Sequence, residues 1–270
     1  MENLTIQNVP VANMIGMAVS LIVVVGLPIV LCIMVRRKTG ARISSFFIGA
    51  ATFIVFALIL EQILHTVVFA AAGTAITGNI WLYALYGGLA AGIFEETGRY
   101  LAMKLCMKKT LNKQNAIMYG VGHGGIEAIL LVGMSCISNL LLSVSINSGQ
   151  LGMLLPMTGL DETTSQQLMA QLSALSMTPA LHFYLAGVER ISAVLFHISA
   201  SYLVYLAVKK KKISWYLLAV LAHFLLDAMT AVMAAYLPVL ALEGILLVFC
   251  GGFAWVIWRM YHKEPASAGV

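Results

Sequence analysis

The chain has 270 residues, of which 61% are hydrophobic and only 10% are charged, and its mean hydropathy is +0.93. Soluble domains average roughly 45 to 50% apolar and 25% charged residues, so this composition excludes an ordinary soluble protein and indicates an integral membrane protein. The net charge of +5 gives no support for nucleic-acid binding, because no basic patch is interleaved with aromatic residues on a soluble face.

Long apolar runs follow one another along the chain. A bilayer core about 30 Å thick requires about 20 helical residues, and these runs lack the alternating segments of an outer-membrane barrel. We therefore expect an all-α, polytopic fold with a single transmembrane domain over residues 1–270. The runs predict seven transmembrane helices, at residues 11–35, 43–72, 80–107, 115–146, 180–208, 213–236 and 239–258.

Basic residues predict the orientation of these helices. Apart from Arg99 and Arg190, every Lys and Arg lies near the end of the first, third, fifth or seventh run or directly after it. Because basic residues gather in cytoplasmic loops and contact anionic lipid heads there, we expect the N-terminus outside and the C-terminus in the cytoplasm. The segment before the first run carries no Lys or Arg, so we interpret that run as a retained helix rather than a signal peptide. We expect the protein in a bacterial plasma membrane.

The one long connection covers residues 147–179, on the side expected to be external. Asp161 is a favourable N-cap residue, and Leu168, Leu172 and Leu175 form one helical stripe after it. This pattern predicts a short amphipathic helix over residues 161–176. We favour a structural lid over a substrate-binding element for this helix.

Ionisable residues lie inside the apolar runs, where each costs about 2.5 to 3.5 kcal/mol to insert. With a rise of about 1.5 Å per residue, polar groups of four runs reach one level near the midplane, on its cytoplasmic side. These groups are Glu96, His123, His197 and His223. Because several such groups together mark a site or an aqueous cavity, the sequence predicts a shared polar interior.

Spacing predicts which of these residues share a helix face. Residues four or seven apart in a helix lie on the same face, so each such pair forms a polar stripe directed at the interior. The pairs are Glu95 with Arg99, His123 with Glu127, Arg190 with His197, and His223 with Asp227.

The residue types predict the chemistry. Adjacent carboxylates such as Glu95 and Glu96 do not easily ionise together in a low-dielectric site, so one of them suits a general base or acid. Arg99 can keep the other ionised, and histidines can orient water, donate to an oxyanion or bind a metal. Glycines on both sides of His123 allow close approach of a backbone or a substrate. Water activation beside a carbonyl suits this set best.

Four motifs carry a family resemblance. "EETGR" at 95–99, "HGGIE" at 123–127, "RISAVLFH" at 190–197 and "HFLLD" at 223–227 occur in this order. Together they resemble the CPBP superfamily of intramembrane proteases, which includes CAAX proteases and bacteriocin-processing enzymes, and most closely its YhfC branch, with PrsW as a neighbour. The resemblance covers about half of the chain and implies an intramembrane endopeptidase acting on membrane proteins or peptides.

The resemblance also implies roles for single residues. Glu95 would be the base that activates water, with Glu96 and Arg99 supporting it. His197 would help to hold the water or a metal, while His223 and Asp227 would stabilise the oxyanion. His123 and Glu127 fall in the second motif of the family, and Arg190 would either pair with a carboxylate or line the site.

Two departures from the CAAX branch bear on the mechanism. That branch has three residues between the second Glu and the Arg, where "EETGR" has two, and its second motif ends in His, where "HGGIE" ends in Glu127. A zinc site from His123, His197 and His223 is an alternative, but the sequence has no H-E-x-x-H motif. We favour a glutamic mechanism without a cofactor.

Two other classes of function compete with the protease. Chains of carboxylates and histidines also build ion relays, so a proton- or ion-coupled transporter is one alternative. A non-catalytic membrane scaffold of the same fold is the other. A transporter predicts polar groups in both halves of the bilayer and inverted repeats, and we detect no repeat. We interpret Glu61 with His65, Glu189 and Glu243 as structural groups or groups at the edge of the cavity.

Overall fold

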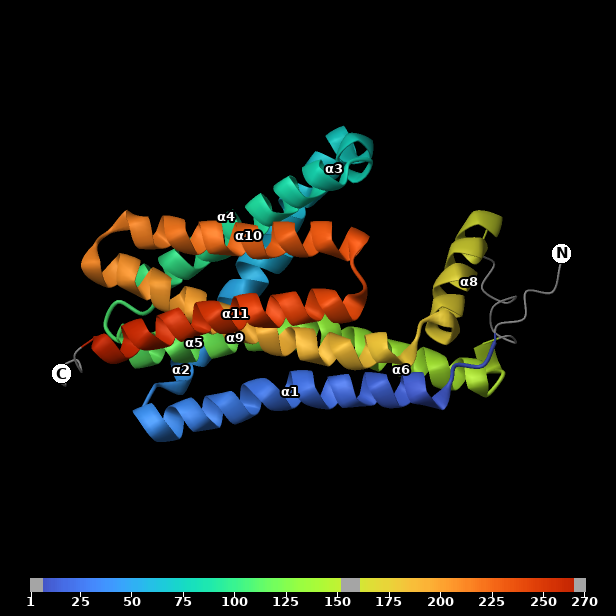
Figure 1. Ribbon diagram of the computed structural model, residues 1–270, viewed down its shortest axis with the longest axis horizontal. Helices are drawn as coiled ribbons and strands as arrows, with labels where there is room; N and C mark the ends of the chain where they lie inside the picture. The colour runs from blue at the N-terminus through green and yellow to red at the C-terminus, as the bar shows by residue number, and fades with distance from the viewer. Residues whose placement is uncertain (1–6, 152–160, 265–270) are drawn as a thin grey trace. The chain divides into compact units, whose positions relative to one another are not determined.

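The computed structural model describes residues 7–151 and 161–264, and within these ranges it contains helices and no strand. Five long helices are α1 (Val11–Thr39), α4 (Ile80–Leu105), α9 (Ala180–Lys210), α10 (Ile213–Tyr236) and α11 (Val239–Lys263), which Figure 1 labels. The predicted all-α architecture is confirmed.

Two of the predicted runs fold as chains of helical segments. The run at 43–72 forms α2 (Ile43–Phe53), the π-helix η1 (Ile54–Glu61) and α3 (Gln62–Thr77). A π-helix widens the turn and shifts the face that follows it, and such segments are frequent at functional sites. The run at 115–146 likewise forms α5 (Lys113–Ala128), the π-helix η2 (Ile129–Gly133) and α6 (Met134–Asn147).

Six stretches of the described chain are long and apolar enough to cross a membrane. They correspond to all the predicted spans except the one at 80–107, which folds as α4. This helix has 26 residues, which is sufficient length, but Glu95, Glu96 and Arg99 lower its hydropathy. The chain is thus a polytopic membrane protein, whereas the seventh span and the orientation of the termini remain predictions.

The chain divides into two compact units, so the single domain expected above also stays a prediction. One unit comprises Met1–Val25 and Ile129–Arg190, and the other comprises Gly26–Ala128 and Ile191–Val270. We call them the smaller and the larger unit.

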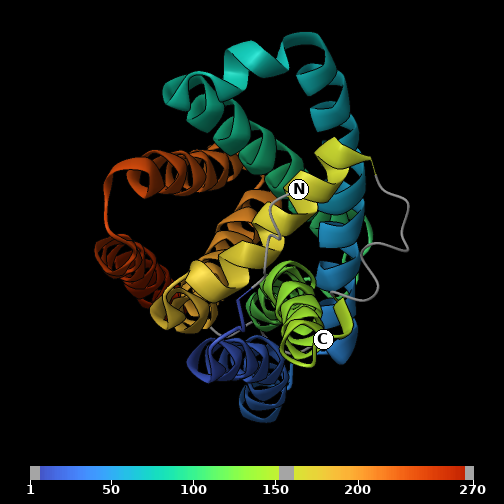
Figure 2. The same ribbon diagram turned by 90° about the vertical axis from the view of Figure 1, so that its right-hand side faces the viewer.

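The smaller unit contains the predicted amphipathic helix, α8 (Glu162–Met177), which lies crosswise to α6 in Figures 1 and 2. Asp161 caps it by accepting hydrogen bonds from the backbone N–H and the hydroxyl of Thr164, and these bonds lower the pKa of Asp161. Leu172 and Leu175 are buried in a cluster with Met17. The helix is confirmed, and its role as a lid stays a prediction; residues 152–160 of the connection lie outside the described residues.

In the larger unit α4 packs against α10, and α2 packs against α5. A buried cluster that includes Met103, Tyr119, Tyr202 and Tyr205 fills the space between these helices and α9. Figure 1 places the ends of α1, α4, α9 and α11 that carry the basic residues at one end of this unit, on the left. The charges that set the expected orientation therefore gather on one side.

Glycines of α5 allow the close helix contacts expected around His123. A Cβ atom on Gly122 would lie 1.9 Å from the carbonyl oxygen of Phe46 in α2, and one on Gly124 would lie 3.0 Å from the Cβ of His197 in α9. Both distances are too short for a larger residue without movement of a helix. Glycine at these positions thus sets how near α5 comes to its neighbours.

Glu264 anchors the basic end of α11. Its carboxylate accepts hydrogen bonds from the hydroxyls of Tyr202 and Tyr205 and from Nζ of Lys209, at 2.7 to 2.8 Å. Nζ of Lys113 donates to its backbone carbonyl at 2.6 Å. Burial alone raises the pKa of the Glu264 carboxyl, but these hydrogen bonds outweigh it and lower that pKa. The carboxylate is therefore held ionised and ties α11 to α9.

We predict that Gly122→Ala destabilises the protein by about 3 kcal/mol, at the upper range for overpacking, because the clash is with backbone. Gly252→Ala in α11 is the matched control, since its Cβ meets nothing within 4 Å. It should stabilise by up to about 1 kcal/mol through helix propensity. Thermal and SDS-induced unfolding in detergent measure both, and equal stability of the two variants would contradict the close contact.

Candidate functional site

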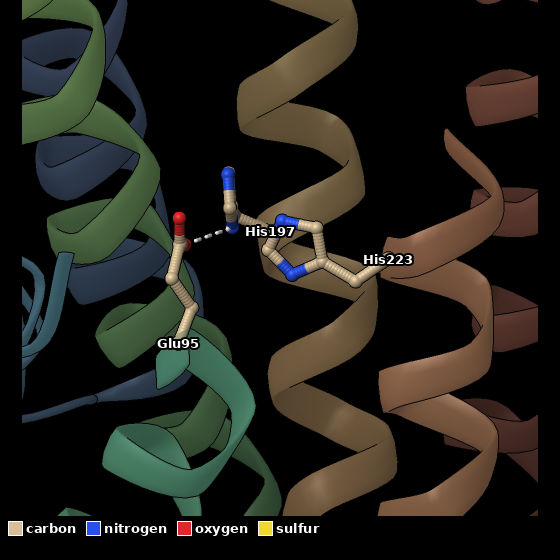
Figure 3. Close-up of side chains that lie close together, drawn as sticks. All are labelled: Glu95, His197 and His223. Carbon is tan, nitrogen blue, oxygen red and sulfur yellow. Dashed lines mark ion pairs between the residues drawn. The ribbon is translucent and has the colours of Figure 1, made fainter. Parts of the chain in front are cut away.

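Three side chains from three helices of the larger unit point toward one another. They are Glu95 of α4, His197 of α9 and His223 of α10, shown in Figure 3. Each offers one ligand atom, and these atoms lie within 4.8 Å of one another. The residues are only 7%, 3% and 3% exposed, respectively. The structure thus brings together two imidazoles and one carboxylate from three of the helices that the sequence expected to meet.

Each histidine of this set is held by a second carboxylate. Nε2 of His197 lies 2.5 Å from a carboxylate oxygen of Glu127 on α5, and Nδ1 of His223 lies 2.9 Å from a carboxylate oxygen of Glu96 on α4. Asp227 lies 3.5 Å from the other nitrogen of His223, one helical turn away. These contacts fix the orientation of both imidazole rings.

His123 pairs with Glu95 rather than with Glu127. Its Nε2 lies 2.8 Å from Oε2 of Glu95, and its ring is fully buried beside the rings of Phe53 and Tyr119. His123 is not part of the three-residue donor group. The zinc set expected from the sequence contained His123 in the place that Glu95 takes in the structure. The two residues of the second motif therefore contact different helices: His123 contacts α4, and Glu127 contacts α9.

Arg99 is fully buried and links α4 to α9. Its Nη1 donates to the carbonyl oxygen of His197 and to Oγ of Ser201, both at 2.7 Å, and its Nη2 lies 3.0 Å from Nδ1 of His197. Its Nε lies 3.1 Å from Glu96, three residues earlier. Glu95 and Arg99 both lie in the continuous helix α4, four residues apart, but the ion pair of Arg99 is with Glu96.

The donor set fits a catalytic metal site. Catalytic zinc is held by three protein ligands, and two histidines with one carboxylate are a known combination. Histidine ligands usually donate their other ring N–H to a carboxylate, as Glu127 and Glu96 allow here. One contact competes, since the guanidinium of Arg99 donates to Nδ1 of His197, the nitrogen that Glu127 leaves for a metal.

Arg190 is also a predicted site residue. It belongs to the smaller unit, and it forms an ion pair with the adjacent Glu189. Its predicted link to His197 through a shared helix face stays a prediction. Asp227 is partly exposed, with 37% of its side chain accessible, so it lies at the open edge of the group.

Sequence reasoning missed two contacts of the site. Ser201 receives a hydrogen bond from Arg99, and the ring of Tyr119 lies 6.0 Å from its guanidinium. Ser201 follows His197 by four residues, so the spacing rule applied above would have found it. Tyr119 precedes His123 by four residues and carries the same signal.

A second polar group lies at the end of η1. Buried Glu61 is 3.2 Å from Nε2 of His65, whose Nδ1 lies 2.7 Å from the hydroxyl of Tyr86 on α4. The hydrogen bond between His65 and Tyr86 joins α3 to α4. This agrees with the structural interpretation of Glu61 and His65.

We predict that Arg99→Met destabilises the protein by about 3 to 5 kcal/mol, because it leaves the buried carboxylate of Glu96 without its cation. The double variant Glu96→Gln/Arg99→Met should recover part of this loss. Arg259→Met, at an exposed position, is the control and should change stability by less than about 0.5 kcal/mol. Unfolding by SDS in mixed micelles measures the stability of all three variants. An Arg99→Met variant as stable as Arg259→Met would refute the role of the pair of Glu96 with Arg99.

The comparisons with known proteins agree with the motifs. The family model described as YhfC intramembrane metalloprotease matches residues 23–248. The chain is 41% identical over 204 residues to the uncharacterized membrane protein YhfC of Bacillus subtilis (strain 168), covering 74% of this chain and 77% of that protein. No solved structure gives a significant match. The chain therefore belongs to the YhfC family of intramembrane metalloproteases.

Proposed function

We propose that the protein is a zinc-dependent endopeptidase that hydrolyses peptide bonds of membrane-associated substrates within the bilayer. The single observation that carries this proposal is the buried group of Glu95, His197 and His223, with a carboxylate behind each imidazole. Membership of a metalloprotease family supports this function over a transporter or a scaffold. It also supports a metal over the cofactor-free mechanism that the motifs alone favoured.

In this proposal Glu95, His197 and His223 hold the metal. A zinc ion in such a site acidifies water and polarises the carbonyl under attack. Glu127 and Glu96 orient the two imidazoles, which raises their basicity as ligands. Asp227 restrains the other side of His223 at the open edge of the group.

Glu127 is proposed to act through His197. Glu95 would bind the metal, and Glu96 is engaged by both Arg99 and His223, so neither suits the role of the base. Glu127 lies against His197 and is 9% exposed. It would hold the ring of His197 from the nitrogen that faces away from the donor group, so it is an orienting residue rather than the base.

Two contacts favour a second mechanism, in which Glu95 itself is the base and no metal takes part. Arg99 already donates to Nδ1 of His197, and His123 already contacts Glu95. In that mechanism Glu95 would take the proton of water, and His123 would hold its carboxylate in place. His223 with Asp227 would stabilise the oxyanion.

The setting of the site bears on the substrate. Glu95, His197 and His223 lie on α4, α9 and α10, of which α9 and α10 are long and apolar enough to span a bilayer. A substrate would therefore present its peptide bond from the membrane. We also propose the seven-span topology with the N-terminus outside, location in a bacterial plasma membrane, and kinship to the CPBP superfamily and PrsW.

Metal content separates the two mechanisms. After incubation with zinc and desalting, the wild-type protein should retain about one zinc ion per chain, as a three-ligand catalytic site predicts. Glu95→Gln and His223→Ala should lose it, while His182→Ala, at an exposed position, should not. Mass spectrometry of the metal measures this. Wild-type protein that retains no zinc, and that keeps its activity in a chelator, would establish the cofactor-free alternative.

Proteolysis tests the function itself. Reconstituted wild-type protein should cleave members of a panel of peptides tethered by one transmembrane helix, and Glu127→Gln should lower the rate by about 10- to 100-fold, as for loss of an orienting carboxylate. The same variant should retain zinc with affinity reduced by about 10- to 100-fold, as for loss of an orienting carboxylate. Cleavage at the wild-type rate by Glu127→Gln and by Glu95→Gln alike would exclude this site as the source of activity.

A further inference from the structure

A groove of about 510 Å³ lies on the larger unit, apart from the donor group. Its walls come from the final turns of α1 and from α5, α9 and α11. They are almost wholly apolar and include Val35, Ile117, Leu195 and Trp258. No acidic residue lines it.

The groove runs along α11 from Gly251 to His262. Eleven residues of helix correspond to about 16 Å of length. Half of the hydrocarbon core of a bilayer is about 15 Å thick. The groove therefore has the length of one leaflet, which is the length available to one acyl chain.

One end of the groove is basic. Thr39 and His262 line this end, and the last turns of α1 and α11 continue from it. These turns carry Arg36, Arg37 and Lys38 on α1 and Lys263 on α11, all exposed. The basic residues that adjoin the lining residues Thr39 and His262 along the chain thus suit an anionic group at the polar surface of the membrane.

The walls at this end are held in place. Nδ1 of His262 lies 2.8 Å from the carbonyl oxygen of Trp258, and the two rings lie 4.6 Å apart. The anchoring of Glu264 by Lys209, described above, fixes the following turn. Because the wall is tied to α9 independently of any occupant, the groove is a formed feature of this unit.

The dimensions favour an occupant narrower than a transmembrane helix. A helix about 10 Å wide and 16 Å long fills roughly 1,300 Å³, more than twice the volume of the groove. A single acyl chain is narrower and matches both the length and the apolar walls.

We propose that this groove binds an anionic phospholipid, with one acyl chain between α1, α9 and α11 and the phosphate at the basic mouth. The proposal is independent of the protease function, because none of the donor residues lines the groove. The lipid would bridge the end of α1 and the end of α11.

Native mass spectrometry of the full chain, released from micelles doped with phosphatidylglycerol or phosphatidylcholine of identical acyl chains, tests the proposal. We expect phosphatidylglycerol to be retained at least about tenfold more than phosphatidylcholine, in line with its negative charge. Gly251→Leu should lower this retention about tenfold by filling the groove. Gly252→Leu is its matched control, since a Cβ at either position meets nothing within 4 Å and only Gly251 lines the groove.

Charge variants test the headgroup separately. Replacing Arg36, Arg37 and Lys38 with Gln should reduce phosphatidylglycerol retention to the level of phosphatidylcholine. The same change at Lys104, Lys108 and Lys109, which are exposed and lie outside the groove, should not. Equal retention of the two lipids by the wild-type protein, or equal retention by Gly251→Leu and Gly252→Leu, would overturn the proposal.

Discussion

The buried guanidinium of Arg99 is the interaction on which the larger unit depends. A charge in the middle of an apolar helix costs about 2.5 to 3.5 kcal/mol on insertion scales, so it persists only where it has partners. Arg99 binds a carboxylate on its own helix and two groups plus a backbone carbonyl on α9. It thereby keeps Glu96 ionised, and Glu96 in turn holds His223. One cation thus connects α4, α9 and α10.

Close packing of α5 also positions the residues of the site. Glycines of α5 bring its backbone against α2 and α9, so His123 and Glu127 reach Glu95 and His197 from the remaining side. Because the interior has a low dielectric, unpaired groups would be costly, and almost every imidazole nitrogen has a carboxylate or a guanidinium beside it. The result is a set of oriented donors whose ligand atoms lie within 4.8 Å of one another. One contact opposes the binding of a cation, because the guanidinium of Arg99 donates to Nδ1 of His197.

The spans and the polar residues of the site were predictable from the sequence, because hydropathy and helical spacing depend on local chemistry. The pairing of these residues was not. Spacing placed Arg99 with Glu95 and His123 with Glu127, whereas Arg99 pairs with Glu96 and with groups on α9, and the other two residues reach partners on other helices. Such partners depend on how helices rotate against one another, and the π-helical segments η1 and η2 change that rotation without a sequence signal that we could identify. The charged residues of α4 lower its hydropathy, so this helix, which carries Glu95, is not among the six stretches apolar enough to span a membrane.

The central claim is that Glu95, His197 and His223 bind one metal ion. X-ray absorption spectroscopy of the zinc-loaded protein tests it most directly, because it reports the ligands rather than the consequences of binding. The account predicts nitrogen and oxygen ligands at about 2.0 to 2.2 Å, a scattering pattern of two imidazoles, and loss of one imidazole in His223→Ala. Sulfur ligands at about 2.3 Å, or a spectrum unchanged in His223→Ala, would place the metal elsewhere and contradict the account.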